Sequence, residues 1–177
     1  MSDSNITKKV YAMALRELME TIPFEKITVA QICEKHGMSR KSFYYHFKDK
    51  YDLVAWIFDT ECVTLLKDRS FTSEQFFSTL CGYLYENRSF YRKVLKIQGQ
   101  NSFSDHLEEF ISPLIQNRLK FIFGQDKVSS ICVDLLTDGF VCSIKRWLLN
   151  NDCLPPDEFV SILETLTEKI ALSYSQE

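Results

Sequence analysis

The stretch that most constrains the fold is residues 28–53, TVAQICEKHGMSRKSFYYHFKDKYDL, which predicts two short helices joined by a tight turn. Thr28 and Gln31 have the spacing of a capping box, in which the Thr28 hydroxyl accepts from a free backbone N–H at the start of a helix. Gly37 can adopt the positive φ that ends a helix, and Ser39 can cap a second helix almost at once. Helices joined this closely must cross steeply. That is the geometry of a helix-turn-helix, whose second helix enters the major groove of DNA.

Basic residues gather in the same stretch, although the chain as a whole is acidic. The 177 residues carry 21 Lys and Arg against 24 Asp and Glu, a net charge of −3. Between residues 35 and 50 the balance is reversed, because Asp49 is the only acid there. The basic residues of this segment are Lys35, His36, Arg40, Lys41, His46, Lys48 and Lys50. Phosphate neutralisation needs such a patch only on the contacting face, so the overall charge is compatible with binding nucleic acid.

The second helix of the motif carries the predicted DNA contacts. Arg40 and Lys41 lie in its first turn, where an Arg fork can bond O6 and N7 of guanine, and we predict that they read bases. Tyr45, one turn further along, can contact a thymine methyl group. For Tyr45 and for its neighbour Tyr44, ordinary half-buried packing is the alternative. Phe43 and Phe47, four residues apart, are expected to face inward. The full predicted set is Thr28, Ser39, Arg40, Lys41, Ser42, Tyr44, Tyr45, His46 and Lys50.

Residues 28–53 also resemble the N-terminal signature of the tetracycline-repressor (TetR) family, above all in FYYHF followed by DKYDL. A further similarity is to the subgroup that contains dihydroxyacetone-kinase operon activators. The resemblance implies phosphate contacts by Tyr44, His46 and Lys50. For Lys50 there is also a physical reason: Asp49 is a predicted N-cap, so Lys50 begins the next helix, whose N-terminus favours a phosphate. The sequence departs from the family pattern at His36 and in the glycine-free turn IPFE at 22–25, both outside the second helix.

Apolar residues at helical spacing predict an all-α protein. A first helix at about 6–22 completes a three-helix head, and a long helix at about 49–67 connects it to the rest of the chain. We therefore expect a helix-turn-helix DNA-binding domain at 1–48 and a helical effector-binding and dimerisation domain at 49–177. The further helices are predicted at 73–86, 88–98, 103–123, 128–150 and 156–173.

The last two predicted helices favour self-association. Their apolar and small residues spread over more of the helix surface than one intramolecular face requires, with a purely intramolecular core helix as the alternative. The resemblance implies a homodimer formed through a four-helix bundle of these helices. The predicted interface residues are Leu135, Gly139, Phe140, Ser143, Trp147, Phe159, Ile162, Leu163 and Leu166.

A ligand site is expected among the aromatic residues in the middle of the chain. Family members enclose an effector in this domain, so the resemblance implies an unidentified small molecule or, alternatively, a partner protein. Aromatic residues at helical spacing also fit an ordinary core. The candidate pocket residues are Trp56, Tyr83, Phe103, His106, Phe110 and Arg146.

Other functions have less support in the sequence. Cys33 and His36, three residues apart, could form a nucleophile and its base, but no third group orients the histidine. We therefore expect that the protein is not an enzyme. Three scattered histidines and six cysteines without a C-x-x-C pair predict neither a metal site nor a cofactor. No apolar run is long enough for a membrane span, and a cytoplasmic protein that does not bind membranes is expected.

The sequence therefore predicts a transcription regulator that binds double-stranded DNA, at a palindromic operator, as a dimer. The resemblance implies a repressor released by an effector. Two alternatives remain open: an activator controlled by a partner protein, and an interaction module that keeps the fold without binding DNA.

Overall fold

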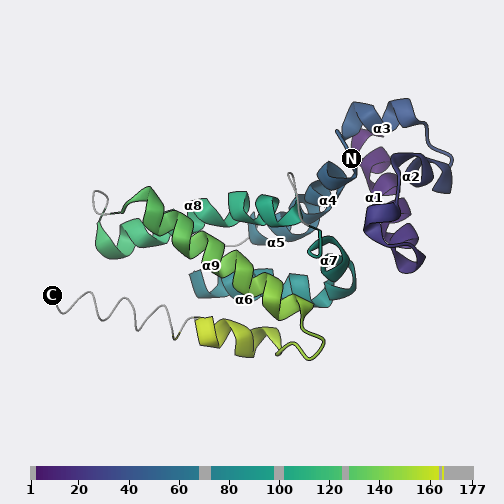
Figure 1. Ribbon diagram of the computed structural model, residues 1–177. Helices are drawn as coiled ribbons and strands as arrows, with labels where there is room; N and C mark the ends of the chain where they lie inside the picture. Colours follow the sequence, from purple (N-terminus) through teal and green to yellow (C-terminus); the bar gives the residue numbers. More distant parts are fainter. Residues whose placement is uncertain (1–2, 68–72, 98–101, 125–127, 164, 166–177) are drawn as a thin grey trace.

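The computed structural model describes residues 3–67, 73–97, 102–124, 128–163 and 165, and every regular element in these segments is helical. Figure 1 shows an elongated molecule, with a small head of α1, α2 and α3 at one end and the longer helices α8 and α9 in the larger body. Helix α4 leads from one part to the other. The prediction of an all-α protein is confirmed.

The head contains α1 (Asp3–Thr21), the short 3₁₀ turn η1 (Phe24–Lys26), α2 (Val29–Lys35) and α3 (Arg40–His46). The Thr28–Gln31 capping box begins α2, and Gly37 has φ of 66° in the turn that follows. The Ser39 side chain then accepts from Ser42 N at 3.1 Å and caps α3. The local signals in the sequence therefore place both helices of the motif as predicted.

An aromatic core holds the head together. Phe43 and Phe47 of α3 are buried, and both meet the buried ring of Tyr11 from α1 edge-on, at centroid distances of 5.2 and 6.2 Å. The Tyr11 hydroxyl also donates to the Ser39 carbonyl, 3.2 Å away. Because α1 holds both the inner face and the N-cap of α3, the opposite face of α3 must point outward.

The long connecting helix is interrupted, which the sequence did not predict. Helix α4 (Lys50–Phe58) runs into a π-helical segment, η2 (Asp59–Val63), before α5 (Thr64–Lys67). A π turn closes its hydrogen bonds one residue later than an α turn and so widens the helix locally. The predicted helix at 49–67 therefore exists as a helical path with one irregular turn.

The body consists of α6 (Ser73–Glu86), α7 (Arg88–Val94), α8 (Phe103–Phe123), α9 (Ser130–Leu149) and a helical stretch at 156–163. Figure 1 shows α9 crossing α8 and running on beside α6, with the last stretch beneath them. Helix α7 ends at Val94, earlier than the predicted limit of 98. The part of the predicted last helix from 166 onward lies outside the described residues. Among the described helices, none is both long enough and apolar enough to cross a membrane.

Candidate nucleic-acid interface

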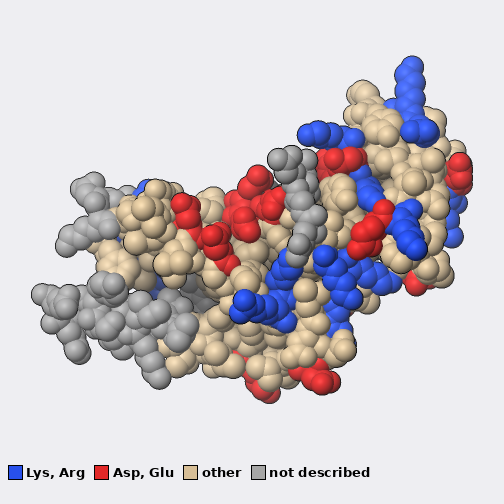
Figure 2. Space-filling model, in the orientation of Figure 1, with Lys and Arg blue, Asp and Glu red and all other residues tan. Residues whose placement is uncertain are grey.

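The outward face of α3 presents the residues that were predicted to read bases. Arg40 and Lys41 are exposed in its first turn, and Tyr44 and Tyr45 are 52% and 84% exposed. In the described part of the chain, neither Arg40 nor Lys41 forms a salt bridge or a side-chain hydrogen bond. Figure 2 shows Lys and Arg side chains projecting from this end of the molecule. Large aromatic and cationic side chains are thus held in water on one short helix, free to contact another molecule.

Other members of the predicted set already have partners inside the head. The Thr28 hydroxyl accepts from Gln31 N, and Gln31 Oε1 accepts in return from Thr28 N at 2.8 Å. Ser39 caps α3, and Ser42 and His46 are half-buried. Thr28 and Ser39 therefore position α2 and α3, whatever else they contact.

The Lys50 ammonium lies against the protein rather than in solvent. It donates to the carbonyl oxygens of Phe24, Glu25 and Ile27 at 2.7, 3.0 and 2.8 Å. These three bonds use all the N–H donors of an ammonium. Burial lowers the pKa of Lys50. A phosphate contact by this side chain requires one of the three bonds to be exchanged, which the sequence did not indicate.

The start of α4 is also less open to an anion than predicted. Asp49 is the N-cap, as expected, and its carboxylate accepts from Tyr51 N and Asp52 N at 2.8 and 2.9 Å. A carboxylate therefore already occupies the position that a phosphate would take at this N-terminus.

Part of the basic patch has a partner within the head. Lys35 Nζ lies 3.3 Å from one Glu17 carboxylate oxygen, and His36 Nε2 lies 3.4 Å from the other. The exposed cations that remain near α3 are Arg40, Lys41 and Lys48. The patch is thus concentrated on α3 and the residues directly after it.

Four of the six predicted pocket residues gather around one ring that the sequence analysis did not select. Phe58, fully buried at the end of α4, has Tyr83, Phe103, His106 and Phe110 within 6.3 Å between ring centroids. His106 Nε2 also lies 2.9 Å from Asp59 Oδ1. Phe58 was missed because its place in the sequence indicates only a core residue of α4.

The other two predicted pocket residues lie elsewhere. Trp56 packs edge-on against Phe47 of the head at 5.8 Å, with the Lys8 ammonium over its ring. Arg146 is exposed on α9. Neither of them belongs to the group of rings around Phe58.

The predicted dimer residues divide into an exposed and a buried group. Leu135 is 70% exposed and Ile162 is 57% exposed, and a Cβ on Gly139 would meet no described atom within 4 Å beyond the neighbouring backbone of its own helix. Trp147 and Phe159 are instead buried against each other, with stacked rings 4.4 Å apart.

The remaining predicted dimer residues belong clearly to neither the exposed nor the buried group. Phe140 packs on Phe77 at 4.5 Å, Ser143 donates to the Gly139 carbonyl, and Leu163 is half-buried against the core. Leu166 lies outside the described residues. The outer face of α9 and of 156–163 is therefore formed by the exposed group, to which Ile131 and Leu136 of α9 also belong. Leu154, in the connection between the two helices, is exposed as well.

Comparisons with known proteins match both parts of the chain. Residues 13–57 match the family model described as bacterial regulatory proteins, tetR family, and residues 72–169 match the model of a transcriptional regulator C-terminal region. The chain is 31% identical over 145 residues to the HTH-type dhaKLM operon transcriptional activator DhaS of Lactococcus lactis subsp. lactis (strain IL1403). That match covers 80% of this chain and 74% of the relative.

A solved structure has a similar fold. It is that of the dihydroxyacetone kinase operon activator DhaS, with a TM-score of 0.66 and 24% sequence identity. The similarity covers 94% of this chain and 97% of that chain, so it extends over the head and the body alike.

Proposed function

Because the chain belongs to the tetR family of bacterial regulatory proteins, whose members regulate transcription and are not enzymes, we propose that it binds a specific DNA operator through α3. The observation that carries this proposal is the outward face of α3, where Arg40, Lys41 and Tyr45 are exposed. We further propose that residues 1–48 form the DNA-binding domain and that residues 49–177 form the domain for dimerisation and signal reception.

Base reading is assigned to Arg40, Lys41 and Tyr45. Helix α3 has seven residues and is about 10 Å long, which suits a major groove about 12 Å wide. In a helix-turn-helix the first turn of the second helix meets the base edges. Arg40 would bond a guanine, Lys41 a base edge or a phosphate, and Tyr45 a thymine methyl group.

Phosphate contacts are assigned to the edges of this face. Tyr44 is exposed and His46 half-buried, so their polar atoms suit the flanking backbone. The Thr28 hydroxyl and Ser42 lie near the helix starts, where backbone N–H groups add to the attraction for phosphate. Lys50 acts in this proposal mainly by holding the head in shape, because its ammonium is bonded to three carbonyls.

A homodimer would supply the second head that a palindromic operator requires. One short helix makes few contacts, and two heads one turn of DNA apart, roughly 34–36 Å, read two half-sites together. The exposed apolar side chains of α9 and 156–163 support an isologous contact through Leu135, Gly139 and Ile162.

The direction of regulation is supported by the relative. The resemblance to the family implied a repressor, but the relative that is 31% identical is named as an operon activator. We therefore favour activation, with repression as the alternative. The signal would be a small effector or a partner protein that acts on the body, with the residues around Phe58 as the candidate ligand site.

Binding to the promoter DNA beside the protein's own gene would test the proposal. Fluorescence anisotropy should show tight binding to one short palindromic segment and weaker, salt-dependent binding to a scrambled segment of equal length. Equal affinity for both DNAs would refute operator recognition. Failure to bind any DNA at low salt would favour the alternative of an interaction module.

A further inference from the structure

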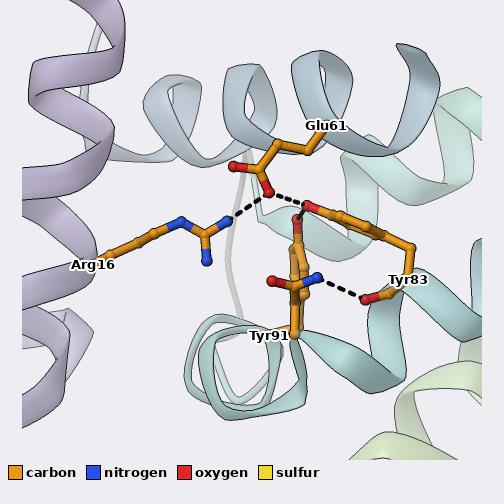
Figure 3. A network of polar contacts seen from close by, with 5 residues as sticks. Arg16, Glu61, Tyr83 and Tyr91 are labelled. Atoms are coloured by element: carbon orange, nitrogen blue, oxygen red, sulfur yellow. Dashed lines mark hydrogen bonds and ion pairs between the residues drawn. The ribbon is translucent and has the colours of Figure 1, made fainter. Parts of the chain in front are cut away.

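Glu61, in the π-helical segment η2, connects the head to the body through a chain of side-chain hydrogen bonds. Its Oε2 atom accepts from Arg16 Nη2 of α1 and from the hydroxyl of Tyr83 of α6, each at 2.8 Å. The Tyr83 hydroxyl lies a further 2.8 Å from the hydroxyl of Tyr91 on α7. Figure 3 shows Arg16 and Tyr83 reaching Glu61 from different helices, with the Tyr91 hydroxyl beside that of Tyr83. Three helical segments, η2, α1 and α6, thus meet at one carboxylate, and α7 is linked to it through Tyr83.

The direction of the hydrogen bonds in this chain is fixed by its chemistry. An ionised carboxylate can only accept hydrogen bonds, so the Tyr83 hydroxyl must donate its one proton in the bond to Glu61. Tyr91 must then donate to the Tyr83 oxygen. Burial raises the pKa of both Tyr83 and Tyr91, so both hydroxyls keep their protons at neutral pH. The order Tyr91 to Tyr83 to Glu61 is therefore maintained, and any shift of Tyr91 is passed on to the carboxylate.

The inner end of this series of hydrogen bonds, Tyr91, lies in the aromatic core of the body. Tyr91 is fully buried and its ring stacks on Phe103, the first residue of α8, with centroids 4.8 Å apart. The ring of Phe58, at the end of α4, meets the rings of both Tyr91 and Phe103 edge-on, at centroid distances of 6.4 and 5.4 Å. A molecule that displaces the start of α8 would therefore displace Tyr91 as well.

The outer end of this series of hydrogen bonds, Arg16, fixes the orientation of α1. The Arg16 guanidinium lies over the ring of Phe90 on α7, 4.6 Å from its centroid, while it donates to Glu61. Lys93 of α7 donates to the carbonyl of Met19, near the end of α1. Helix α1 packs on α3 through Tyr11, so the orientation of α1 sets that of the DNA-binding face.

Glu61 lies in a π turn, so the direction of its side chain depends on the geometry of that turn. In an α-helix each residue turns by about 100°, so a change from π to α geometry would rotate Glu61 away from both partners. We propose that Glu61 is a positioning residue for operator binding: it holds the head at a fixed angle to the body for as long as Arg16 and Tyr83 both bind it. This inference rests on the proposed function, since it assigns the head a DNA target.

The angle of the head can be measured without DNA. Two nitroxide labels, at Glu34→Cys on α2 and Gln116→Cys on α8, report the distance between head and body by double electron–electron resonance spectroscopy. Cys132, Cys142 and Cys153 are replaced by serine, and labelled protein is diluted with unlabelled protein, so that only distances within one chain are seen. Cys33, Cys62 and Cys81 are buried and can stay.

Tyr83→Phe and Glu61→Gln should each broaden or shift this distance distribution. Tyr85→Phe is the matched control: it removes the same atom from the same helix, but Tyr85 stacks on Trp147 and lies outside the chain of hydrogen bonds. Circular dichroism checks that each variant is folded. If Glu61→Gln does not fold, Tyr83→Phe alone provides the test. An unchanged distribution in Tyr83→Phe would overturn the proposal.

Operator affinity supplies the second measurement. Arg16→Gln and Tyr83→Phe should each change it by roughly two- to thirty-fold. Because both act through Glu61, the double variant should differ from wild type by no more than the larger single effect. Full additivity would overturn the role of Glu61. If wild-type protein binds no operator while Tyr83→Phe still alters the distances, the proposed function fails, and the part of the proposal that concerns the angle between head and body stands.

Discussion

The ammonium of Lys50, in the first turn of α4, lies 2.7 Å from the carbonyl oxygen of Phe24, 26 residues earlier in the chain. The same nitrogen bonds the carbonyls of Glu25 and Ile27 and lies 4.6 Å from the centre of the Phe24 ring. The turn before α2 contains no glycine, and a cation from another helix holds its carbonyl groups together. Lys50 therefore joins α4 to the start of the helix-turn-helix.

Replacing Lys50 tests whether this side chain holds the head or binds DNA. Lys50→Met removes three hydrogen bonds to backbone carbonyls, and we expect a loss of roughly 1–3 kcal/mol in the free energy of unfolding. Operator affinity should fall while its dependence on salt keeps the same slope. Urea denaturation and a salt titration of binding measure the two effects. If Lys50 instead contacts a phosphate, the slope should fall by about one unit, whereas exposed Lys48→Met should leave stability unchanged.

Arg40 is expected to contribute to specificity rather than to general affinity. Arg40→Ala removes an exposed side chain that has no partner in the described part of the head, so stability should not change. Binding to the operator should weaken by about 1–3 kcal/mol, and binding to random DNA much less. Competition binding with the two DNAs measures the difference, with exposed Arg118→Ala on α8 as the control. Equal losses on both DNAs would contradict base reading by Arg40.

The outer face of α9 offers a clean test of dimerisation. Leu135 is 70% exposed, so Leu135→Asp should leave the monomer folded while it places a charge in the proposed interface. Sedimentation should show a dimer for wild type and a monomer for the variant. Trp147→Ala would not serve, because it opens the buried stack on Phe159 and should cost about 3–5 kcal/mol of stability. A wild-type protein that is monomeric at micromolar concentration would refute the dimer.

Two buried thiols predict a loss of stability at alkaline pH. Burial raises the pKa of Cys62 and of Cys81 to about 12. In the unfolded chain these thiols ionise near their ordinary pKa of 9.0, so above that pH the unfolded state holds fewer protons than the native state. The free energy of unfolding should therefore fall as pH rises from about 9 to about 12, and these groups should have no effect at lower pH.

The contribution of one thiol can be isolated by substitution. Cys81→Ala should make the alkaline decline shallower by up to about 1.4 kcal/mol per pH unit, the value for one proton. Cys132→Ala, at an exposed position, should leave the decline as it is. Denaturant midpoints across this pH range measure both variants. A decline that is equally steep in Cys81→Ala would show that this thiol is not its source.

The helix-turn-helix could be predicted from the sequence because its signals are local. Thr28 and Gln31 cap α2, Gly37 turns the chain with positive φ, and Ser39 caps α3, each through atoms no more than a few residues apart. The inward direction of Phe43 and Phe47 follows from their helical spacing, and it fixes the outward direction of the residues between them. A short-range hydrogen bond or a helical period needs no knowledge of the rest of the chain.

The tertiary structure alone decided which distant side chains meet. Lys50 looked like a free cation in the sequence, Trp147 like an interface residue, and Glu61 like one acid in a regular helix. The carbonyl partners of Lys50 lie 23 to 26 residues away in the sequence. Arg16 and Tyr83, the partners of Glu61, lie 45 and 22 residues away from it. Such contacts depend on how helices cross and on a single π turn, and these follow from the packing of all side chains together. Periodicity gives the face of each helix, but the crossing of the helices decides what that face touches.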